Sequence, residues 1–287
     1  MKAVCPPVYV GCQGWRYPDW RVQTGVLAAL AAPFYGADTR PTEELARYSQ
    51  TFDLVEVDAT FYAIPKASVV EQWRDQTPAP FRFTLKLPRL LTHEARLRRG
   101  QATLAQFCDR ARLLGSKLAA VLIQLPPSFG VEERASLERF MPYLPTDLPF
   151  AIEFRSSPWF TLQTLELLHR YRVALTLGET PWLPSALSLA WLDHLPTDWL
   201  YVRIMGAKEG GLTRFTHLQI DREEILSTWA TALRERPHLT AYVLVDNHFQ
   251  GFSPGTATLL KRGLGQEERP FPCDQLPAGT PVQLGLL

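Results

Sequence analysis

Eight short apolar runs, separated by stretches with helical spacing, constrain the fold of this chain more than any other feature. The runs cover residues 8–13, 53–58, 81–87, 118–125, 149–155, 173–178, 199–204 and 240–246. Strands that alternate with helices form a parallel sheet, because each helical crossover returns the chain in the same direction. Eight such units in 287 residues predict an α/β protein, a single (β/α)8 TIM barrel.

The intervals between the runs carry the spacing of amphipathic helices. Leu45, Tyr48 and Phe52 form an apolar stripe with steps of three and four residues. Before the last run, Asp221 followed by Glu224 offers a helix cap. These intervals therefore predict the helices that cover the outside of the barrel.

Two segments fall outside the repeating pattern. Residues 14–40 are an aromatic-rich excursion after the first run, and residues 265–287 are a tail containing Pro and Gly. We therefore expect a barrel domain over residues 1–264 and an irregular C-terminal tail over residues 265–287.

Composition and charge narrow the class of protein. The net charge is +1 and the pI is near 7.7, so no overall field attracts nucleic acid or an acidic membrane. The 4 cysteines lack the short spacings of a zinc or redox motif. No leader peptide and no apolar run near the roughly 20 residues of a membrane span is evident. We expect a soluble, cytoplasmic protein.

Alternation along the strands predicts which side chains point into the barrel. Val55 and Val57 suit the helix layer, so Glu56 and Asp58 face inward. The same rule turns further polar side chains inward at the C-terminal ends of other runs, namely Gln13, Lys86, Gln124, Glu153, Arg155, Arg203 and Asp246. The earlier inward positions are small or apolar, namely Tyr9, Gly11, Ala120, Leu122, Ala151, Tyr201 and Leu244. A packed lower half under a polar upper end predicts a ligand site, because the βα loops open on that face.

The inward ions must pair, because an unpaired buried ion costs several kcal/mol. We predict contacts of Glu56 with Lys86 and of Arg203 with Asp246, which lie on neighbouring strands. Apolar side chains stabilise a barrel at least as well as buried ion pairs do. So many ions therefore indicate a site rather than a structural plug.

Several motifs in sequence order resemble those of the YecE-like family, also called domain of unknown function 72. They are GCQGWRYPDW at 11–20, FDLVEVDATFYAIP at 52–65, FRFTLKLPRLLTH at 81–93, QLPPSF at 124–129, AIEFRSSPW at 151–159 and YVRIMG at 201–206. The resemblance covers roughly residues 8–263 and implies a barrel with a site at its C-terminal end. It implies no accepted activity.

Two positions depart from the pattern of that family. Met205 stands where the family usually has a His, and Asp246 with Asn247 stand where it usually has a pair of Asn. If the chemistry of the family needs that His, His248 or His217 would have to take its place.

The inward residues suggest an enzyme that uses acid–base chemistry on a small anionic, sugar-like or nucleotide-like substrate. Its candidate catalytic residues are Glu56, Lys86, His93 and Glu153. Its candidate substrate-binding residues are Gln13, Trp15, Tyr17, Tyr62, Gln124, Arg155, Trp159, Arg203, Lys208, Asp246, Asn247 and His248. Lys208 belongs to a glycine-containing loop after the seventh run, a common phosphate position in barrels. The aromatic residues, with Trp20, could form a wall for a sugar or base.

Other chemistries remain open. Glu56 and Glu153 could serve a glycosidase, but Lys86 and Arg155 are expected to keep both acids ionised, which does not suit a proton donor. A metal-dependent hydrolase or endonuclease would want clustered ligands, yet there are 6 histidines and no H-x-H or H-x-x-E-H spacing. No motif for an organic cofactor is present, and no metal is assigned. The remaining alternative is a non-catalytic barrel that binds a ligand or a nucleic-acid end through Arg155, Arg203 and the aromatics.

Overall fold

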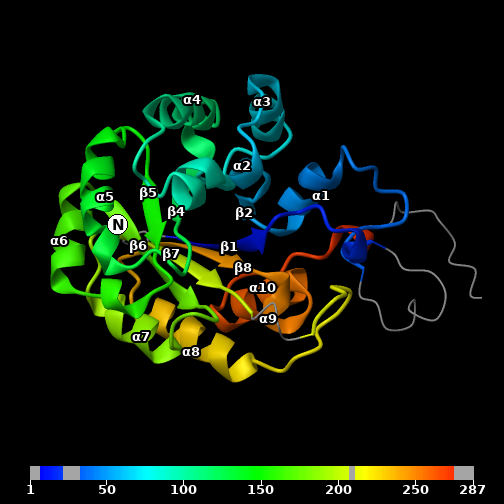
Figure 1. The fold of residues 1–287 in the computed structure, drawn as a ribbon. Coiled ribbons are helices and arrows are strands. Elements are labelled where there is room, and N and C mark those ends of the chain that lie inside the picture. The colour runs from blue at the N-terminus through cyan, green and yellow to red at the C-terminus, as the bar shows by residue number, and fades with distance from the viewer. Residues whose placement is uncertain (1–6, 22–32, 207–210, 275–287) are drawn as a thin grey trace, which may run out of the picture.

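The computed structural model describes residues 7–21, 33–206 and 211–274. Eight parallel strands close into one barrel in sequence order (Figure 1). The strands are β1 (Val8–Gln13), β2 (Leu54–Val57), β3 (Arg82–Lys86), β4 (Leu118–Gln124), β5 (Phe150–Glu153), β6 (Val173–Glu179), β7 (Trp199–Ile204) and β8 (Thr240–Val245). The predicted (β/α)8 barrel is confirmed.

Helices surround the barrel on the outside (Figure 1). They are α1 (Glu44–Thr51), α2 (Ala59–Tyr62), α3 (Ala67–Asp75), α4 (Gln101–Arg112), α5 (Arg134–Phe140), α6 (Leu162–Arg170), α7 (Ser185–Ala190), α8 (Glu223–Arg234), α9 (Asn247–Gln250) and α10 (Ser253–Gly263). On α8, Leu226, Trp229 and Leu233 form the buried face. Asp221 accepts a hydrogen bond from the Glu223 amide at 3.1 Å, although α8 begins two residues after Asp221.

The strands separate two apolar cores. Val55 and Val57 belong to the outer core between strands and helices. The inner core contains Leu54, Ala119, Ala120, Leu122, Ala151, Ala174, Tyr201 and Leu244, with Tyr9, Trp199 and Tyr242 packed against it. The predicted strand phase is therefore confirmed.

Aromatic rings close the N-terminal end of the barrel. Tyr9 stacks on Tyr242 with ring centroids 5.4 Å apart, and Trp199 meets the same Tyr242 ring edge-on at 5.9 Å. Since this end is packed, an opening for a ligand inside the barrel must lie at the opposite, C-terminal end, here called the mouth.

The described parts of the excursion and of the tail pack against each other beside α1 (Figure 1). Trp20, Phe34 and Tyr35 are fully buried, and Phe271 of the tail lies 5.1 Å from Phe34 between ring centroids. Residues 22–32 and 275–287 lie outside the described residues. Among the helices that the structure describes, none has the length and apolar composition to cross a membrane.

Candidate functional site

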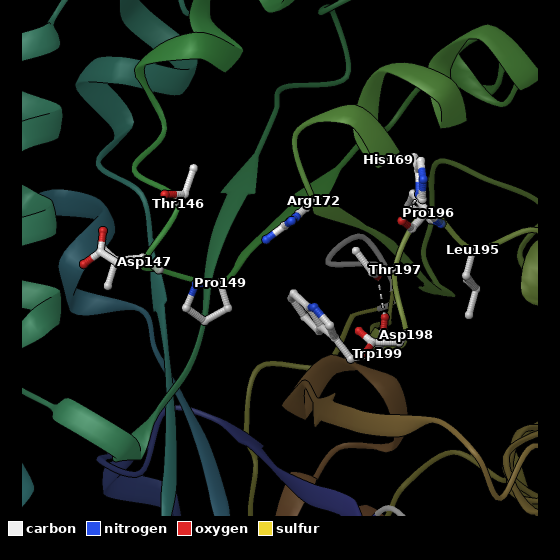
Figure 2. Close-up of a pocket in the computed structure, with 11 residues that line it drawn as sticks. Thr146, Asp147, Pro149, His169, Arg172, Leu195, Pro196, Thr197, Asp198 and Trp199 are labelled. Carbon is white, nitrogen blue, oxygen red and sulfur yellow. Dashed lines mark hydrogen bonds between the residues drawn. The ribbon is translucent and has the colours of Figure 1, made fainter.

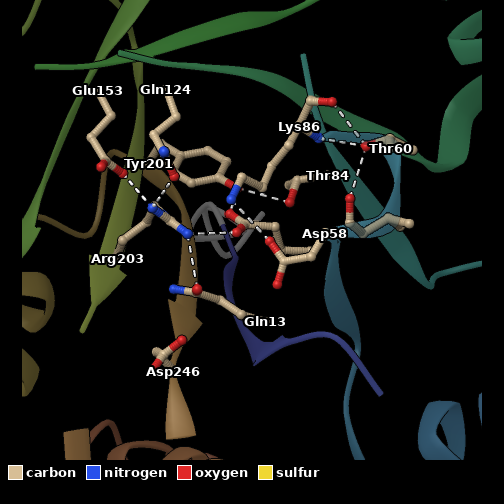
Figure 3. A network of polar contacts seen from close by, with 12 residues as sticks. Gln13, Asp58, Thr60, Thr84, Lys86, Gln124, Glu153, Tyr201, Arg203 and Asp246 are labelled. Atoms are coloured by element: carbon tan, nitrogen blue, oxygen red, sulfur yellow. Dashed lines mark hydrogen bonds and ion pairs between the residues drawn. The ribbon is translucent and has the colours of Figure 1, made fainter. Parts of the chain in front are cut away.

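The side chain of Arg203 occupies the centre of the barrel below the mouth (Figure 3). Its Nη1 donates to Gln124 Oε1 at 3.2 Å and to Glu153 Oε2 at 2.5 Å. Its Nη2 donates to Gln13 Oε1 at 2.8 Å and to Glu56 Oε1 at 2.7 Å. These five residues, here called the Arg203 cluster, come from β7, β4, β5, β1 and β2, so their contacts require that all five side chains point inward.

The Arg203 cluster is almost completely shielded from water. No member is more than 5% exposed. Below it, the Tyr201 hydroxyl donates to Glu56 Oε2 at 2.7 Å and lies 2.8 Å from Thr84 Oγ1. Both oxygens of Glu56 are therefore engaged by protein groups. The cluster forms the lower boundary of the mouth.

The ion pairs differ from those predicted. Lys86 Nζ lies 3.1 Å from Asp58 Oδ1, and Arg203 pairs with Glu56 and Glu153. In the described part of the chain, neither Glu56 with Lys86 nor Arg203 with Asp246 forms a direct ion pair, so both predictions are wrong. Strand phase sets the face of a side chain, but a long guanidinium can reach across the barrel instead of contacting its neighbour.

Glu153 and Glu56 differ in their affinity for a proton. Burial alone would raise the pKa of Glu153, but the charges and hydrogen bonds of Arg203 and Arg155 lower it to about 2. For Glu56, burial is the largest effect and raises its pKa; the nearby charge of Asp58 adds to this, and Arg203 opposes it. Glu153 is therefore ionised, whereas Glu56 takes up a proton more readily than the sequence led us to expect.

One side of the mouth is cationic. Arg155 Nε donates to Glu153 Oε1 at 2.6 Å, and its guanidinium carbon lies 3.6 Å from the centre of the Trp182 ring. Lys86 Nζ lies 4.6 Å from the centre of the Phe61 ring. Both cations are held against aromatic faces, a favourable geometry for a charged side chain.

His93 lies on this cationic side. Its Nδ1 is 2.9 Å from Thr92 Oγ1, and its ring meets Phe61 edge-on at 5.0 Å. Burial and then the charges of Arg155 and Lys86 lower the pKa of His93 to about 4. His93 is therefore neutral near pH 7. Within the described residues no group bonds its Nε2.

The opposite side of the mouth carries acidic groups. The Tyr17 hydroxyl donates to the Gln13 carbonyl oxygen at 2.9 Å. Burial and then the charges of Asp58 and Asp246 raise the pKa of Tyr17 well above its ordinary value. Asp246 Oδ1 accepts from the backbone N–H of His248 at 2.7 Å and lies 2.8 Å from the ring Nδ1 of that residue.

Buried N–H donors at the mouth lack a protein acceptor. They belong to Gln13 Nε2, Asn247 Nδ2 and Arg203 Nε, as judged over the described ranges. Asn247 Oδ1 accepts from the Trp20 indole at 3.1 Å and from the Ser253 amide at 2.9 Å, which fixes the orientation of its amide. Leaving such a donor unpaired costs about 1–3 kcal/mol, so the site favours oxygen acceptors from solvent or a ligand.

The loop between β3 and α4 holds His93 in an unusual backbone. It contains a π-helical turn at Leu90–Glu94, followed by Arg96 and Leu97 at φ values of 48° and 60°. Arg96 is bound by Glu133 and donates to the Ser128 carbonyl oxygen at 2.8 Å. Backbone strain of this kind persists where surrounding contacts enforce it, often at functional sites.

The model of the family described as "Protein of unknown function DUF72" matches residues 9–281. The chain belongs to the DUF72 family.

Relatives within this family support the assignment. The UPF0759 protein YecE of Escherichia coli strain K12 is 31% identical over 153 residues, which are 53% of this chain and 50% of YecE. The UPF0759 protein YunF of Bacillus subtilis strain 168 is 31% identical over 161 residues, which are 54% and 52% of the two chains. The chain therefore spans about half the length of the curated relatives it matches.

Solved structures of DUF72 proteins share the fold. One from Thermotoga maritima has a TM-score of 0.68 and 24% identity, covering 90% of this chain and 99% of its own. One from Enterococcus faecalis has a TM-score of 0.64 and 21% identity, covering 80% and 96%. The resemblance to the YecE-like family is therefore confirmed, as is the barrel.

In this DUF72 protein, several expected aromatic contacts are absent from the mouth. Trp159 is fully buried, stacks on Phe154 at 4.6 Å and donates its indole N–H to the Phe129 carbonyl oxygen at 2.8 Å. Trp15 instead packs edge-on against Trp73 of α3 at 5.9 Å. Trp159 and Trp15 therefore make packing contacts in this structure, and their predicted role in binding a substrate stays a prediction.

Other aromatic residues have different places. Tyr62 is 77% exposed and touches Phe61 edge-on at 5.3 Å. Tyr17 does lie at the mouth. Trp182, against Arg155, is an aromatic site residue that the sequence analysis missed, because it lies in a loop after β6 with no periodic signal; its position shortly after a strand end could have indicated it.

The positions where this DUF72 chain departs from the family pattern can also be placed. Met205 is buried. A Cβ atom on Gly206 would lie 1.7 Å from the His248 carbonyl oxygen, so the β7 end touches the β8 end there and needs glycine. His217 Nδ1 lies 2.9 Å from Thr216 Oγ1, whereas His248 bonds to Asp246 at the mouth. Lys208 lies outside the described residues.

Among the residues that the structure describes, no three His, Cys, Asp or Glu side chains are grouped so as to hold a metal ion.

Proposed function

We propose that this DUF72 protein is an enzyme that performs acid–base chemistry at the mouth of its barrel. Its substrate would be a small sugar-like or nucleotide-like molecule that carries an anionic group. The observation that carries this proposal is the set of buried, unpartnered donors on Gln13, Asn247 and Arg203. Hydroxyl, carbonyl or phosphate oxygens of a ligand would accept hydrogen bonds from them.

The energetics of the Arg203 cluster support a functional role. Replacing buried ion pairs by apolar groups is often neutral or stabilising. Arg203, Glu56 and Glu153 are all at most 2% exposed. Stability alone therefore gives no reason for these ions, whereas a rigid, charged base under a ligand site does.

The cationic side would hold the anionic group of the substrate. Lys86 and Arg155 retain some exposure, with side chains 11% and 10% exposed. Their positive charge also lowers the pKa of His93. An anion between them would gain attraction from both cations without displacing the ion pairs below.

His93 is the best-placed proton acceptor. With a pKa of about 4 it is neutral near pH 7 and has a free lone pair, but it becomes an effective base for a substrate hydroxyl or an acidic C–H bond only when its pKa rises towards the working pH. Binding of an anion would raise that pKa and increase its basicity. Glu56 and Glu153 would act as positioning residues, since both are shielded by Arg203.

A glycosidase with Glu56 and Glu153 as its carboxylate pair receives no support from this geometry. The Arg203 guanidinium contacts both carboxylates at 2.7 Å and 2.5 Å. It therefore occupies the space where a sugar ring would have to lie.

A second candidate function is binding without turnover. Each carboxylate at the mouth has a cationic or imidazole partner: Arg203 for Glu56, Lys86 for Asp58, Arg155 for Glu153 and His248 for Asp246. A site whose acids are all paired could recognise a ligand, including a nucleic-acid end, without chemistry.

A ligand screen by thermal shift separates these candidates. Sugar phosphates, nucleotides and small carboxylates would be tested on wild type, Lys86→Met, Arg155→Met and His93→Gln, with Arg139→Met, at an exposed position of the outer helix α5, as the control. We expect a hit that raises Tm in wild type and Arg139→Met but not in Lys86→Met or Arg155→Met.

Turnover of that hit is then followed in His93→Gln. Retained binding with at least about 100-fold slower turnover supports His93 as the base. Binding without turnover in wild type supports the second candidate. Binding that survives both Lys86→Met and Arg155→Met contradicts a site at the mouth.

A further inference from the structure

A second cavity opens at the opposite end of the barrel from the mouth. It has a volume of about 890 Å³ and is lined by the segments 146–149 and 195–199 together with His169 and Arg172 (Figure 2). These residues lie just before β5, β6 and β7 or, for Trp199, at the start of β7. The volume falls within the range of about 300–1,000 Å³ that is usual for small-molecule sites.

Arg172 supplies a cation in this cavity. Its side chain points into the space between Pro149 and Trp199 (Figure 2). Over residues 7–21, 33–206 and 211–274, neither a hydrogen bond nor an ion pair involves its guanidinium. It is therefore free to bind an anion in two-pronged fashion.

The backbone conformation of Arg172 is unfavourable for any residue other than glycine. It follows the end of α6 with φ at 55°, and its N–H donates to the His169 carbonyl oxygen at 3.1 Å. Helices that end in a left-handed residue normally use glycine there. Folding alone would favour glycine at this position, so the arginine side chain requires another explanation.

Trp199 supplies an aromatic surface beside Arg172. Its ring is half-buried and rests edge-on against Tyr242 at 5.9 Å. Because that contact holds the ring in place, little side-chain freedom would be lost when a planar molecule stacks on it.

The acidic residues of the cavity do not repel an anion strongly. Asp147 is neutralised by Arg112, whose Nε and Nη2 lie 2.8 Å and 3.0 Å from its two oxygens. Asp198 is exposed to solvent, where water and salt screen its charge. His169 is held by a contact of 3.0 Å between its Nδ1 and the Pro196 carbonyl oxygen.

From these contacts we infer that the cavity at the N-terminal end of the barrel is a second ligand site. It takes a planar aromatic molecule with an anionic group, which stacks on Trp199 and pairs with Arg172. Nucleotides and aromatic carboxylates share this chemistry. The site is separate from the mouth and does not depend on the proposed acid–base function.

Calorimetric titration with AMP, UMP and 4-hydroxybenzoate tests the inference, with adenosine and inorganic phosphate as half-ligands. We expect at least one of the three aromatic anions to bind with a Kd below about 1 mM, and adenosine and phosphate to bind at least about tenfold more weakly. Binding by AMP or UMP alone identifies a nucleotide site, and binding by 4-hydroxybenzoate alone an aromatic carboxylate site.

The decisive variant is Arg172→Gly, with Arg170→Ala as the matched control two residues earlier. Because glycine suits the left-handed backbone, Arg172→Gly should keep or raise Tm while weakening binding at least about tenfold. Arg170→Ala should leave the affinity unchanged. Binding that Arg172→Gly does not weaken, or a Kd above about 1 mM for all three aromatic anions, overturns the inference.

Discussion

At the scale of single residues, Arg203 determines the character of the mouth. One guanidinium satisfies two carboxylates and two amide oxygens from four other strands. The arrangement is tolerable inside the barrel only because every charge has a partner. Removing the guanidinium would leave Glu56 and Glu153 as uncompensated buried acids.

Arg203→Met is therefore expected to lower the free energy of unfolding by about 3–5 kcal/mol, measured by urea denaturation at pH 7. Arg170→Met, at an exposed position of α6, should change it by less than about 0.5 kcal/mol. A loss below about 1 kcal/mol for Arg203→Met would show that the cluster is not a tightly coupled buried network.

Glu153 predicts a dependence of stability on pH. Its pKa is lowered in the folded protein to about 2 from 4.5, so the folded state holds this proton less tightly than the unfolded chain. The stabilisation is complete above about pH 5 and is lost as the pH falls towards 2; it amounts to about 3 kcal/mol.

Urea denaturation of wild type and Glu153→Gln between pH 6 and pH 2.5 measures this contribution. The difference in free energy of unfolding between the two should shrink as the pH falls. A difference that stays constant over this range would mean that Glu153 is not held ionised by Arg203 and Arg155.

At the scale of elements, the strands could be predicted closely and the loops could not. The apolar run at 240–246 became β8 (Thr240–Val245), and the inward positions within the strands, such as Glu56 and Arg203, followed from alternation. Contacts across the barrel, such as Arg203 with Glu56, depend on the length of the side chains and on how the strands close into a barrel. Alternation along a strand predicts neither. The π-helical turn at Leu90–Glu94 and the position of Trp182 have no periodic signal at all.

The loop between β3 and α4 carries its own prediction. Arg96→Ala removes the contacts with Glu133 and Ser128 that hold the left-handed backbone, so amides of residues 95–98 should exchange about tenfold faster. Hydrogen exchange by mass spectrometry measures this. Arg98→Ala is the control, because Arg98 also reaches Glu133, at 3.2 Å, but its side chain is 60% exposed. Equal effects from both variants would argue against a specific role of Arg96 in placing His93.

At the scale of the whole molecule, the barrel has two unlike ends. The interior of the barrel is closed at the lower end by the rings of Tyr9, Tyr242 and Trp199. At the upper end it holds the Arg203 cluster, in which Gln13 and Arg203 carry donors that are unpartnered within the described residues. The mouth agrees with the general use of the C-terminal face of such barrels for ligands, and the second site inferred above would be an addition to that pattern. The net charge of +1 gives no sign of the ionic groups at the mouth, because their positive and negative charges compensate one another.

A crystal structure at a resolution of about 1.5 Å, where ordered waters and small ligands are visible, tests the central claim most directly. We expect Arg203 to contact both Glu56 and Glu153, and an oxygen atom of water or ligand to lie about 2.7–3.2 Å from Gln13 Nε2 and from Asn247 Nδ2. Protein acceptors on both amides, or an Arg203 side chain turned out of the barrel, would contradict the account.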